Sequence, residues 1–455
     1  MTQALTTRAG LSLSESLSYL QRYYFIAKLG GEVNYGLFKD LEDMRSDEFN
    51  QRSVNFFNRS NITLLMQRDL FNQGVNAGDA REAIAVFMMD PQTVVFSNMG
   101  FYPPGSDIPE HTLNLYQPPR VCGQPGGDSK RITEYILEVI CDGNYVLFNY
   151  FMQWLAHALR RPHEKPGVMI VLIGEQGVGK GLLLALLRRI FGPTAWQTSS
   201  INHVVGRFNA WLEGVMIVML DEALFEGDKK SHDIMKSLIT EAMITVEQKN
   251  RPVMQMPSFH RYIAATNHKV FSKIEISDRR HAYFHVSSKY KGDKKYFSEL
   301  FGLISNDIEV AKFVNQLYEV DLSDFSPGIA PKSQLRDEQV VQSLEGFEAF
   351  WYQCLLNGFE EMAESFFSDE DFKWTEAKGG FVSAGKILSE YNHWLTGHRR
   401  YRNLNYRDIK EHISNYVGDC SARGNMRGYN LPGLVVLRER FESTLGLASA
   451  LDWCD

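Results

Sequence analysis

The chain has 455 residues, of which 44% are hydrophobic and 23% are charged. These proportions are typical of an ordinary globular protein of about three domains and exclude disorder, collagen-like repeats and coiled-coil rods. The net charge of −7 decides nothing about nucleic acid, because basic residues can gather in a cleft while the outer surface stays acidic.

The sequence also argues against membrane and secreted proteins. The longest apolar runs are Val168–Ile173, Leu182–Leu187 and Val215–Leu220, far shorter than the ~18 residues of a membrane span. The stretch Leu11–Ser18 alternates leucine with serine, unlike the apolar region of a secretory signal. Five cysteines without a CxxC pair fit a reducing cytosol and neither a disulfide framework nor a zinc ribbon. We therefore expect a cytoplasmic protein with no membrane partner.

The first part of the chain, residues 1–128, predicts a mixed α+β domain. A helix is expected at Leu13–Arg22, followed by strands at Tyr23–Leu29 and Val33–Phe38 around a glycine turn. A stretch rich in proline and glycine closes this domain. Residues 129–165 have apolar side chains at helical spacing, interrupted at Asp142-Gly143, and predict a helical segment.

The middle of the chain, residues 166–290, alternates buried strands with helices and predicts an α/β fold with a mostly parallel sheet. Strands are expected at Val168–Ile173, Val215–Leu220 and Tyr262–Thr266, and helices at Gly181–Phe191 and Asp233–Glu241. Residues 291–340 predict a helical connector, and residues 341–455 predict a mostly helical C-terminal domain.

The clearest motif lies directly between the first of these strands and its helix, and it has the GxxxxGK spacing of a phosphate-binding loop. Glycines let backbone N–H groups surround phosphates, the helix N-terminus adds positive charge, and the lysine reaches the β- and γ-phosphates. Neither residue after the lysine is the serine or threonine that usually binds Mg²⁺. The candidate nucleotide-binding residues are Gly174, Glu175, Gln176, Gly177, Val178, Gly179, Lys180, Gly181 and Leu182.

Two acids follow the second strand, the first of them 41 residues after Lys180. The carboxyl ends of parallel strands are where ligands bind in such sheets. Asp221 is therefore the candidate ligand for Mg²⁺ through water, and Glu222 is the candidate base for a catalytic water.

Polar side chains after the third strand complete this candidate site. Asn267 follows the strand directly and could hold a water at the γ-phosphate, or it could be a turn residue. Arg279 and Arg280 could reach the γ-phosphate of a neighbouring subunit, or form an ion pair within the chain.

Together these motifs resemble a superfamily 3 helicase domain, an AAA+-type ATPase, in the form found in phage and plasmid primase-helicase proteins. The resemblance covers roughly residues 90–345 and rests on GEQGVGKG, MLDEALFEGDKK, LITEAMITVEQKNR, AATNH and SDRRHAYFHV. It implies an AAA+-type P-loop ATPase core, with residues 129–165 as an oligomerisation collar. It also implies ATP and Mg²⁺ as cofactors and the cytoplasm of a bacterial host cell as the location. No priming activity is carried over to residues 1–128, because they lack an obvious acidic metal triad.

The resemblance further implies a DNA-gripping hairpin with strands at Ile244–Val246 and Val253–Met256, whose tip would present Lys249, Asn250 and Arg251 to phosphates. A second candidate DNA surface is the basic and aromatic stretch near residue 400, whose candidates are Arg399, Arg400 and Arg402. That stretch would belong to a winged-helix domain, or else be an ordinary solvated surface.

The resulting hypothesis is an ATP-dependent DNA helicase of a phage, prophage or plasmid. It would act as a hexameric ring that moves on single-stranded DNA and unwinds forked duplex, beside a separate primase or polymerase. One alternative is a replication initiator or loader that melts an origin. Another is a nucleotide-gated DNA-binding assembly protein with weak hydrolysis. A small-molecule P-loop kinase is disfavoured, because the hairpin and Asn267 would have no function there.

Overall fold

The structure is a computed structural model that describes residues 10–29, 31–39, 54–124, 129–222, 229–247, 253–268, 279–356, 379–398, 403–423, 426–447, 451 and 453. The chain forms two compact units, Met1–His268 with Phe284–Ile329, and Lys269–Tyr283 with Ala330–Asp455. Among the described residues, no helix is both long enough and apolar enough to span a bilayer.

The N-terminal part of the first unit combines helices with a small sheet. Its elements are α1 (Leu13–Tyr23), β1 (Tyr24–Leu29), β2 (Glu32–Leu37), α3 (Arg59–Asn72), α4 (Ala77–Phe87) and β3 (Val95–Phe96), with sheet order β2-β1-β3. Strands β1 and β2 pair antiparallel, from Tyr24 opposite Leu37 to Leu29 opposite Glu32. The helix and the hairpin expected from the sequence are therefore confirmed. Two short parallel strands follow, β4 (Asn98–Gly100) and β5 (Thr112–Asn114).

The next segment is helical, as expected. Helix α5 (Lys130–Tyr135) continues as a π-helical turn, Ile136–Ile140, before α6 (Tyr145–Arg160). The chain breaks between them at Asp142 and Gly143, which have φ angles of 48° and 73°. A left-handed backbone cannot continue a helix, which explains the interruption seen in the sequence.

The centre of the first unit is a five-stranded sheet with the order β12-β6-β11-β8-β7. Strand β11 (Arg261–Thr266) pairs parallel with both β6 (Met169–Ile173) and β8 (Ile217–Asp221). The outer strands are β7 (Ala195–Thr198), parallel to β8, and β12 (His281–His285). The three strands expected from the sequence and their parallel arrangement are confirmed.

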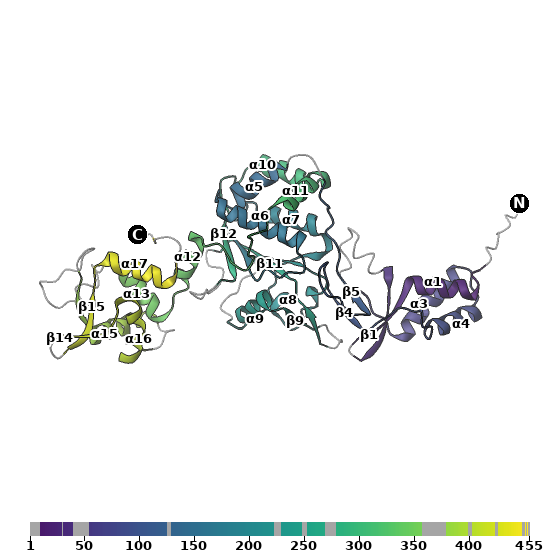
Figure 1. Ribbon diagram of the computed structural model, residues 1–455, viewed down its shortest axis with the longest axis horizontal. Coiled ribbons are helices and arrows are strands. Elements are labelled where there is room, and N and C mark those ends of the chain that lie inside the picture. The colour runs from purple at the N-terminus through teal and green to yellow at the C-terminus, as the bar shows by residue number, and fades with distance from the viewer. Residues whose placement is uncertain are drawn as a thin grey trace. The chain divides into compact units, whose positions relative to one another are not determined.

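Helices cover both faces of this sheet. In Figure 1, α6 and α7 (Lys180–Phe191) lie above β11, while α8 (Asn202–Val205) and α9 (Lys229–Thr240) lie below it. Burial on both faces accounts for the apolar sequences of β6 and β8. Short 3-10 turns at Gly192–Thr194 and Ala210–Leu212 connect these elements. The result is a mixed α/β fold with a parallel sheet.

The first unit also contains a hairpin and two further helices. Strands β9 (Met243–Val246) and β10 (Met254–Pro257) form an antiparallel hairpin, with Val246 opposite Met254. This confirms the two expected hairpin strands. Helices α10 (Lys294–Ile304) and α11 (Asp307–Glu319) follow β12.

The second unit has its own apolar core, built by helices around a small antiparallel sheet of order β13-β15-β14. The strands are β13 (Gly380–Ser383), β14 (Ser421–Arg423) and β15 (Met426–Leu431). The helices are α12 (Gln334–Gln342), α13 (Gly346–Leu356), α15 (Ala384–Trp394), α16 (Tyr406–Val417) and α17 (Leu434–Leu445). The five-segment domain division expected from the sequence stays a prediction.

Candidate nucleotide-binding site

The loop between β6 and α7 has the backbone geometry of a phosphate cradle. Gly177 and Gly179 have φ angles of 80° and 109°, which side chains with a Cβ atom rarely adopt. A Cβ atom on Gly179 would also lie 2.9 Å from a ring carbon of Phe297. Tyr135, which is fully buried, donates a hydrogen bond of 2.9 Å to the Gly179 carbonyl and holds the loop from the side of α5.

Lys180 begins α7 and turns back over its own loop. Its Nζ atom donates to the carbonyl oxygens of Gly174 and Glu175, at 2.5 and 2.8 Å. The side chain is only 8% exposed, and this burial lowers the pKa of its ammonium, while the charges of Glu222 and Asp221 act in the opposite direction. A largely buried ammonium that donates to carbonyl oxygens favours an anionic partner.

The two predicted acids meet the loop at the carboxyl edge of the sheet. Asp221 ends β8, and its Oδ2 atom accepts a hydrogen bond of 2.8 Å from the amide of Gln197 on β7. Glu222 has a left-handed φ of 55°, and its N–H donates to Ala265 of β11 at 2.8 Å. Such a conformation is costly for a glutamate and is typical of functional sites.

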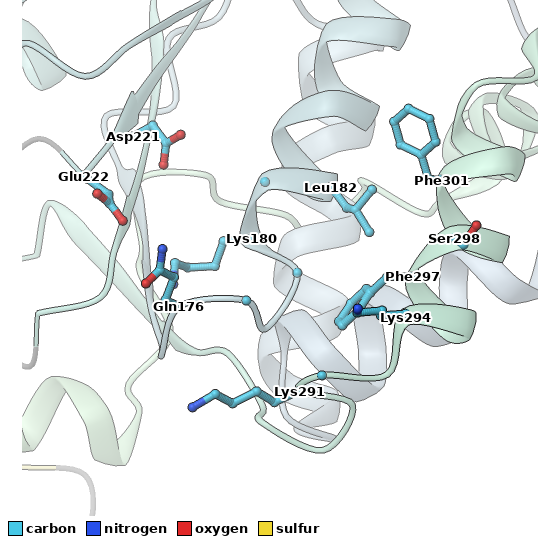
Figure 2. A pocket seen from close by; sticks show the side chains of 14 residues that line it. Gln176, Lys180, Leu182, Asp221, Glu222, Lys291, Lys294, Phe297, Ser298 and Phe301 are labelled. Atoms are coloured by element: carbon cyan, nitrogen blue, oxygen red, sulfur yellow. The ribbon is translucent and has the colours of Figure 1, made fainter.

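These groups line one pocket of about 840 Å³, formed by the loop, the start of α7, the two acids and α10. Figure 2 shows Lys180 between the acids on one side and Leu182 with the aromatic residues of α10 on the other. The lining residues are Gln176, Gly177, Gly179, Lys180, Gly181, Leu182, Asp221, Glu222, Lys291, Gly292, Lys294, Phe297, Ser298 and Phe301. The structure therefore brings the predicted loop and both acids together.

The remaining predicted site residues are placed as follows. Asn267 is exposed directly after β11, and its amide donates to Glu222 at 3.3 Å. Arg279 is exposed and Arg280 half-buried, just before β12, and their reach toward a neighbouring subunit stays a prediction. The candidate DNA-binding residues Lys249, Asn250, Arg251, Arg399, Arg400 and Arg402 lie outside the described residues.

Sequence reasoning missed the supporting residues of the pocket. Gln197, which orients Asp221, lies on a strand that the sequence did not predict. Phe297 and Phe301 line the pocket from a segment predicted to be a connector. Lys291 forms an ion pair with Glu175 across the loop. No motif marks these residues. Lys291, Phe297 and Phe301 follow the loop by more than 100 positions, and Gln197 contacts Asp221 only because β7 pairs with β8.

The donor set suits a nucleoside triphosphate carried with Mg²⁺. Within the described ranges, no group of three or more histidine, cysteine, aspartate or glutamate residues could hold a metal alone. Mg²⁺ typically takes one or two carboxylates, phosphate oxygens and water. The pair Asp221 and Glu222 provides those carboxylates, and Lys180 with the N-terminus of α7 provides the positive charge for phosphates.

The chain is similar to a family of unknown function and to a phage DNA primase-polymerase. Residues 172–280 match the model of a family of unknown function, DUF5906. The DNA primase-polymerase of Nitratiruptor phage NrS-1 is 26% identical over 291 residues, which are 61% of this chain and 40% of that protein. The match thus spans about two-fifths of the relative's length.

Solved structures of the C-terminal region of the NrS-1 protein share the fold. Two apo structures align with a TM-score of 0.63 and 19% identity, covering 91% of this chain and 98% of theirs. A further apo structure gives a TM-score of 0.60 and 18% identity over 88% of this chain and 94% of its own. At this identity the likeness establishes a common fold.

These findings overturn the predicted helicase. The family model that matches is not a superfamily 3 helicase domain, and the relative is a DNA primase-polymerase. The resemblance, the ATP hydrolase and helicase activity, the ring motor and both alternative functions were therefore wrong. The physical reason is that a phosphate loop with strand-end acids specifies a bound phosphate and metal, which many reactions share, and does not specify the reaction.

Proposed function

We propose that this chain acts in DNA replication of the primase-polymerase kind, as a phage protein inside the bacterial host cell. Its part is to bind a nucleoside triphosphate with Mg²⁺ in the pocket at the carboxyl edge of the sheet. The observation that supports this proposal is that Lys180, the glycine loop and two carboxylates line one pocket. The 26% identity with a DNA primase-polymerase supports the replication context.

Different residues of the pocket would bind the phosphates and the metal. Lys180 exchanges the carbonyls of Gly174 and Glu175 for phosphate oxygens, and N–H groups at the start of α7 bind the same anion. Asp221, oriented by Gln197, holds Mg²⁺ through water. Glu222 supplies the second negative charge. On this proposal, β6, the loop and α7 form a P-loop nucleotide-binding core, with ATP as one of its ligands.

Direct binding tests the pocket. Fluorescence-detected titration of the chain with ATP and Mg²⁺ should saturate, and Lys180→Ala should abolish saturation, because it removes the charge that pairs the phosphates. Lys130→Ala provides a control, because its exposed side chain pairs with Glu134 on α5 and does not line the pocket. Unchanged affinity in Lys180→Ala would refute the assignment.

Primer synthesis tests the replication activity. The chain is incubated with a single-stranded DNA template, Mg²⁺ and mixed ribo- and deoxyribonucleoside triphosphates, and products are resolved by size. We expect oligonucleotide products that decrease in Lys180→Ala. The absence of products with the parental chain contradicts nucleotidyl transfer by this chain, and equal products from Lys180→Ala contradict a role of the pocket.

The second unit supports a proposal of DNA binding by a winged-helix arrangement. Helices α15 and α16 pack on the antiparallel sheet, and α16 exposes side chains near its N-terminal end, as a recognition helix does. Tyr406 is 61% exposed, and Lys410 is exposed one turn further on. The side chain of Arg407 is 88% exposed, and its 3.5 Å ion pair with Glu411 is weak enough to be exchanged for a phosphate.

Salt dependence tests this surface. In a double variant, Arg407→Ala with Lys410→Ala, the slope of log affinity for duplex DNA against log salt should decrease by about 1–2. Lys28→Ala with Arg59→Ala provides a matched control, because both residues are exposed and belong to the other unit. An unchanged slope in the α16 variant would assign DNA binding elsewhere.

A further inference from the structure

The pocket has two chemically different ends. Asp221 and Glu222 lie on one side of Lys180, and Leu182, Phe297 and Phe301 lie on the other (Figure 2). The first end is anionic and suits a metal. The second end is apolar, although it opens from the same phosphate loop.

The apolar end is built by the loop side of α10. The ring of Phe297 lies against the loop, 2.9 Å from the position of a Cβ atom on Gly179. Phe301 follows four residues later on the same helix face and is 56% exposed. Leu182, in the first turn of α7, is half-buried and completes this apolar wall, which we define as Leu182, Phe297 and Phe301.

The order of the phosphates fixes which end receives the nucleoside. The lysine of a phosphate loop contacts the β- and γ-phosphates, and the metal lies with the carboxylates. In a bound triphosphate, the γ-phosphate would therefore point toward Asp221 and Glu222. The α-phosphate and the nucleoside would then leave over the N-terminus of α7, on the side of the apolar wall.

We propose, building on the nucleotide-binding function above, that the apolar wall receives the nucleobase and recognises it by stacking. The polar side chains that α10 adds to the described lining are those of Lys294 and Ser298, both exposed. Exposed, rotatable groups do not read the hydrogen-bonding edge of one particular base. The preferred ligands are purine nucleoside triphosphates, adenine and guanine alike, because purines offer more stacking area than pyrimidines.

This assignment also explains Leu182, which stands close to the position where a metal-binding hydroxyl residue was expected. A leucine gives up that ligand and adds apolar surface facing Phe301 (Figure 2). On this proposal, the side chain of Leu182 contacts the nucleobase and does not bind the metal.

The test compares nucleotides with a ligand that has phosphates and no base. Affinities of the full chain for ATP, GTP, CTP and inorganic tripolyphosphate are measured with Mg²⁺. Phe301→Ala should weaken ATP and GTP binding about tenfold, the lower range for loss of one aromatic–base stack, and leave tripolyphosphate binding unchanged. Phe71→Ala provides a matched control, because Phe71 is 49% exposed on α3, and Phe301→Tyr should restore affinity.

The outcomes separate this inference from the function on which it depends. If the parental chain binds neither ATP nor tripolyphosphate, the nucleotide-binding function itself fails. If both bind but Phe301→Ala changes neither, or weakens both equally, the base does not lie on the apolar wall. A preference above tenfold for ATP over GTP, or the reverse, overturns recognition by stacking alone.

Discussion

Glu222 offers a prediction in which stability and binding change in opposite directions. Its φ of 55° is a left-handed conformation, which costs about 1–2 kcal/mol for a residue with a Cβ atom. Glycine adopts it without that cost. Replacing Glu222 by glycine should therefore stabilise the first unit relative to replacement by alanine, by about 1 kcal/mol, or roughly fivefold in the folding equilibrium.

The comparison with Glu222→Ala isolates the backbone effect. Both variants lose the carboxylate and the 3.3 Å hydrogen bond from Asn267, and both keep the N–H of residue 222 that bonds to Ala265. These losses cancel in the difference. In a backbone with negative φ the order would be reversed, because alanine is normally favoured over glycine by about 0.5–1 kcal/mol.

Denaturant unfolding, followed by tryptophan fluorescence, measures the two free energies of unfolding. Trp196 on the neighbouring strand β7 reports on this part of the sheet. The same two variants should show equal loss of Mg²⁺-dependent nucleotide affinity, because both lack the acid. If Glu222→Ala is as stable as Glu222→Gly or more stable, the argument from backbone strain is wrong.

Three further predictions concern the loop and the base of the sheet. Gly181→Ser should tighten Mg²⁺–ATP binding several-fold and leave metal-free binding unchanged. A Cβ atom at position 181 meets nothing within 4 Å, and the serine hydroxyl can bind the metal. Titrations with and without a chelator measure the two affinities. Tyr135→Phe should lower ATP affinity about fivefold, since it removes one hydrogen bond of ~1 kcal/mol to the loop, and unchanged affinity would mean that the loop keeps its shape alone. Burial lowers the pKa of His260 to about 4, below its unfolded value near 6.5, so stability should fall as pH decreases from 6.5 to 4, by at most about 1.4 kcal/mol per pH unit. His260→Asn removes this titrating group, so the slope of the free energy of unfolding against pH should decrease by the contribution of one proton. Unfolding curves measured across this pH range test this, and an unaltered slope would contradict burial of a neutral histidine.

The sequence predicted those parts of the site that one contiguous motif specifies. The loop from Gly174 to Gly181, its strand and its helix are local, and the buried strand that ends in Asp221 is visible as an apolar run. Two supporting residues could not be predicted. Gln197 contacts Asp221 through the order of the strands, and Phe301 reaches the pocket through helix packing, and both depend on contacts distant in sequence.

The reaction could not be predicted for a different reason. A glycine loop, a lysine and two strand-end acids bind phosphate and metal in many classes of enzyme, so the helicase hypothesis depended on the resemblance and was wrong. The break at Asp142 and Gly143, in contrast, was visible in the sequence because backbone sterics act locally.

The strand order has a consequence for how the chain folds during synthesis. Strand β11 is the central partner of β6 and β8 but follows both in the sequence. At translation rates of ~5–20 residues per second, β6 waits on the order of ten seconds before its partner leaves the ribosome. Until then, β6 and β8 expose apolar strand edges that favour aggregation. We therefore expect the nascent chain to depend on a chaperone until Arg261–Thr266 has been synthesised, and fragments that end before Arg261 to be insoluble.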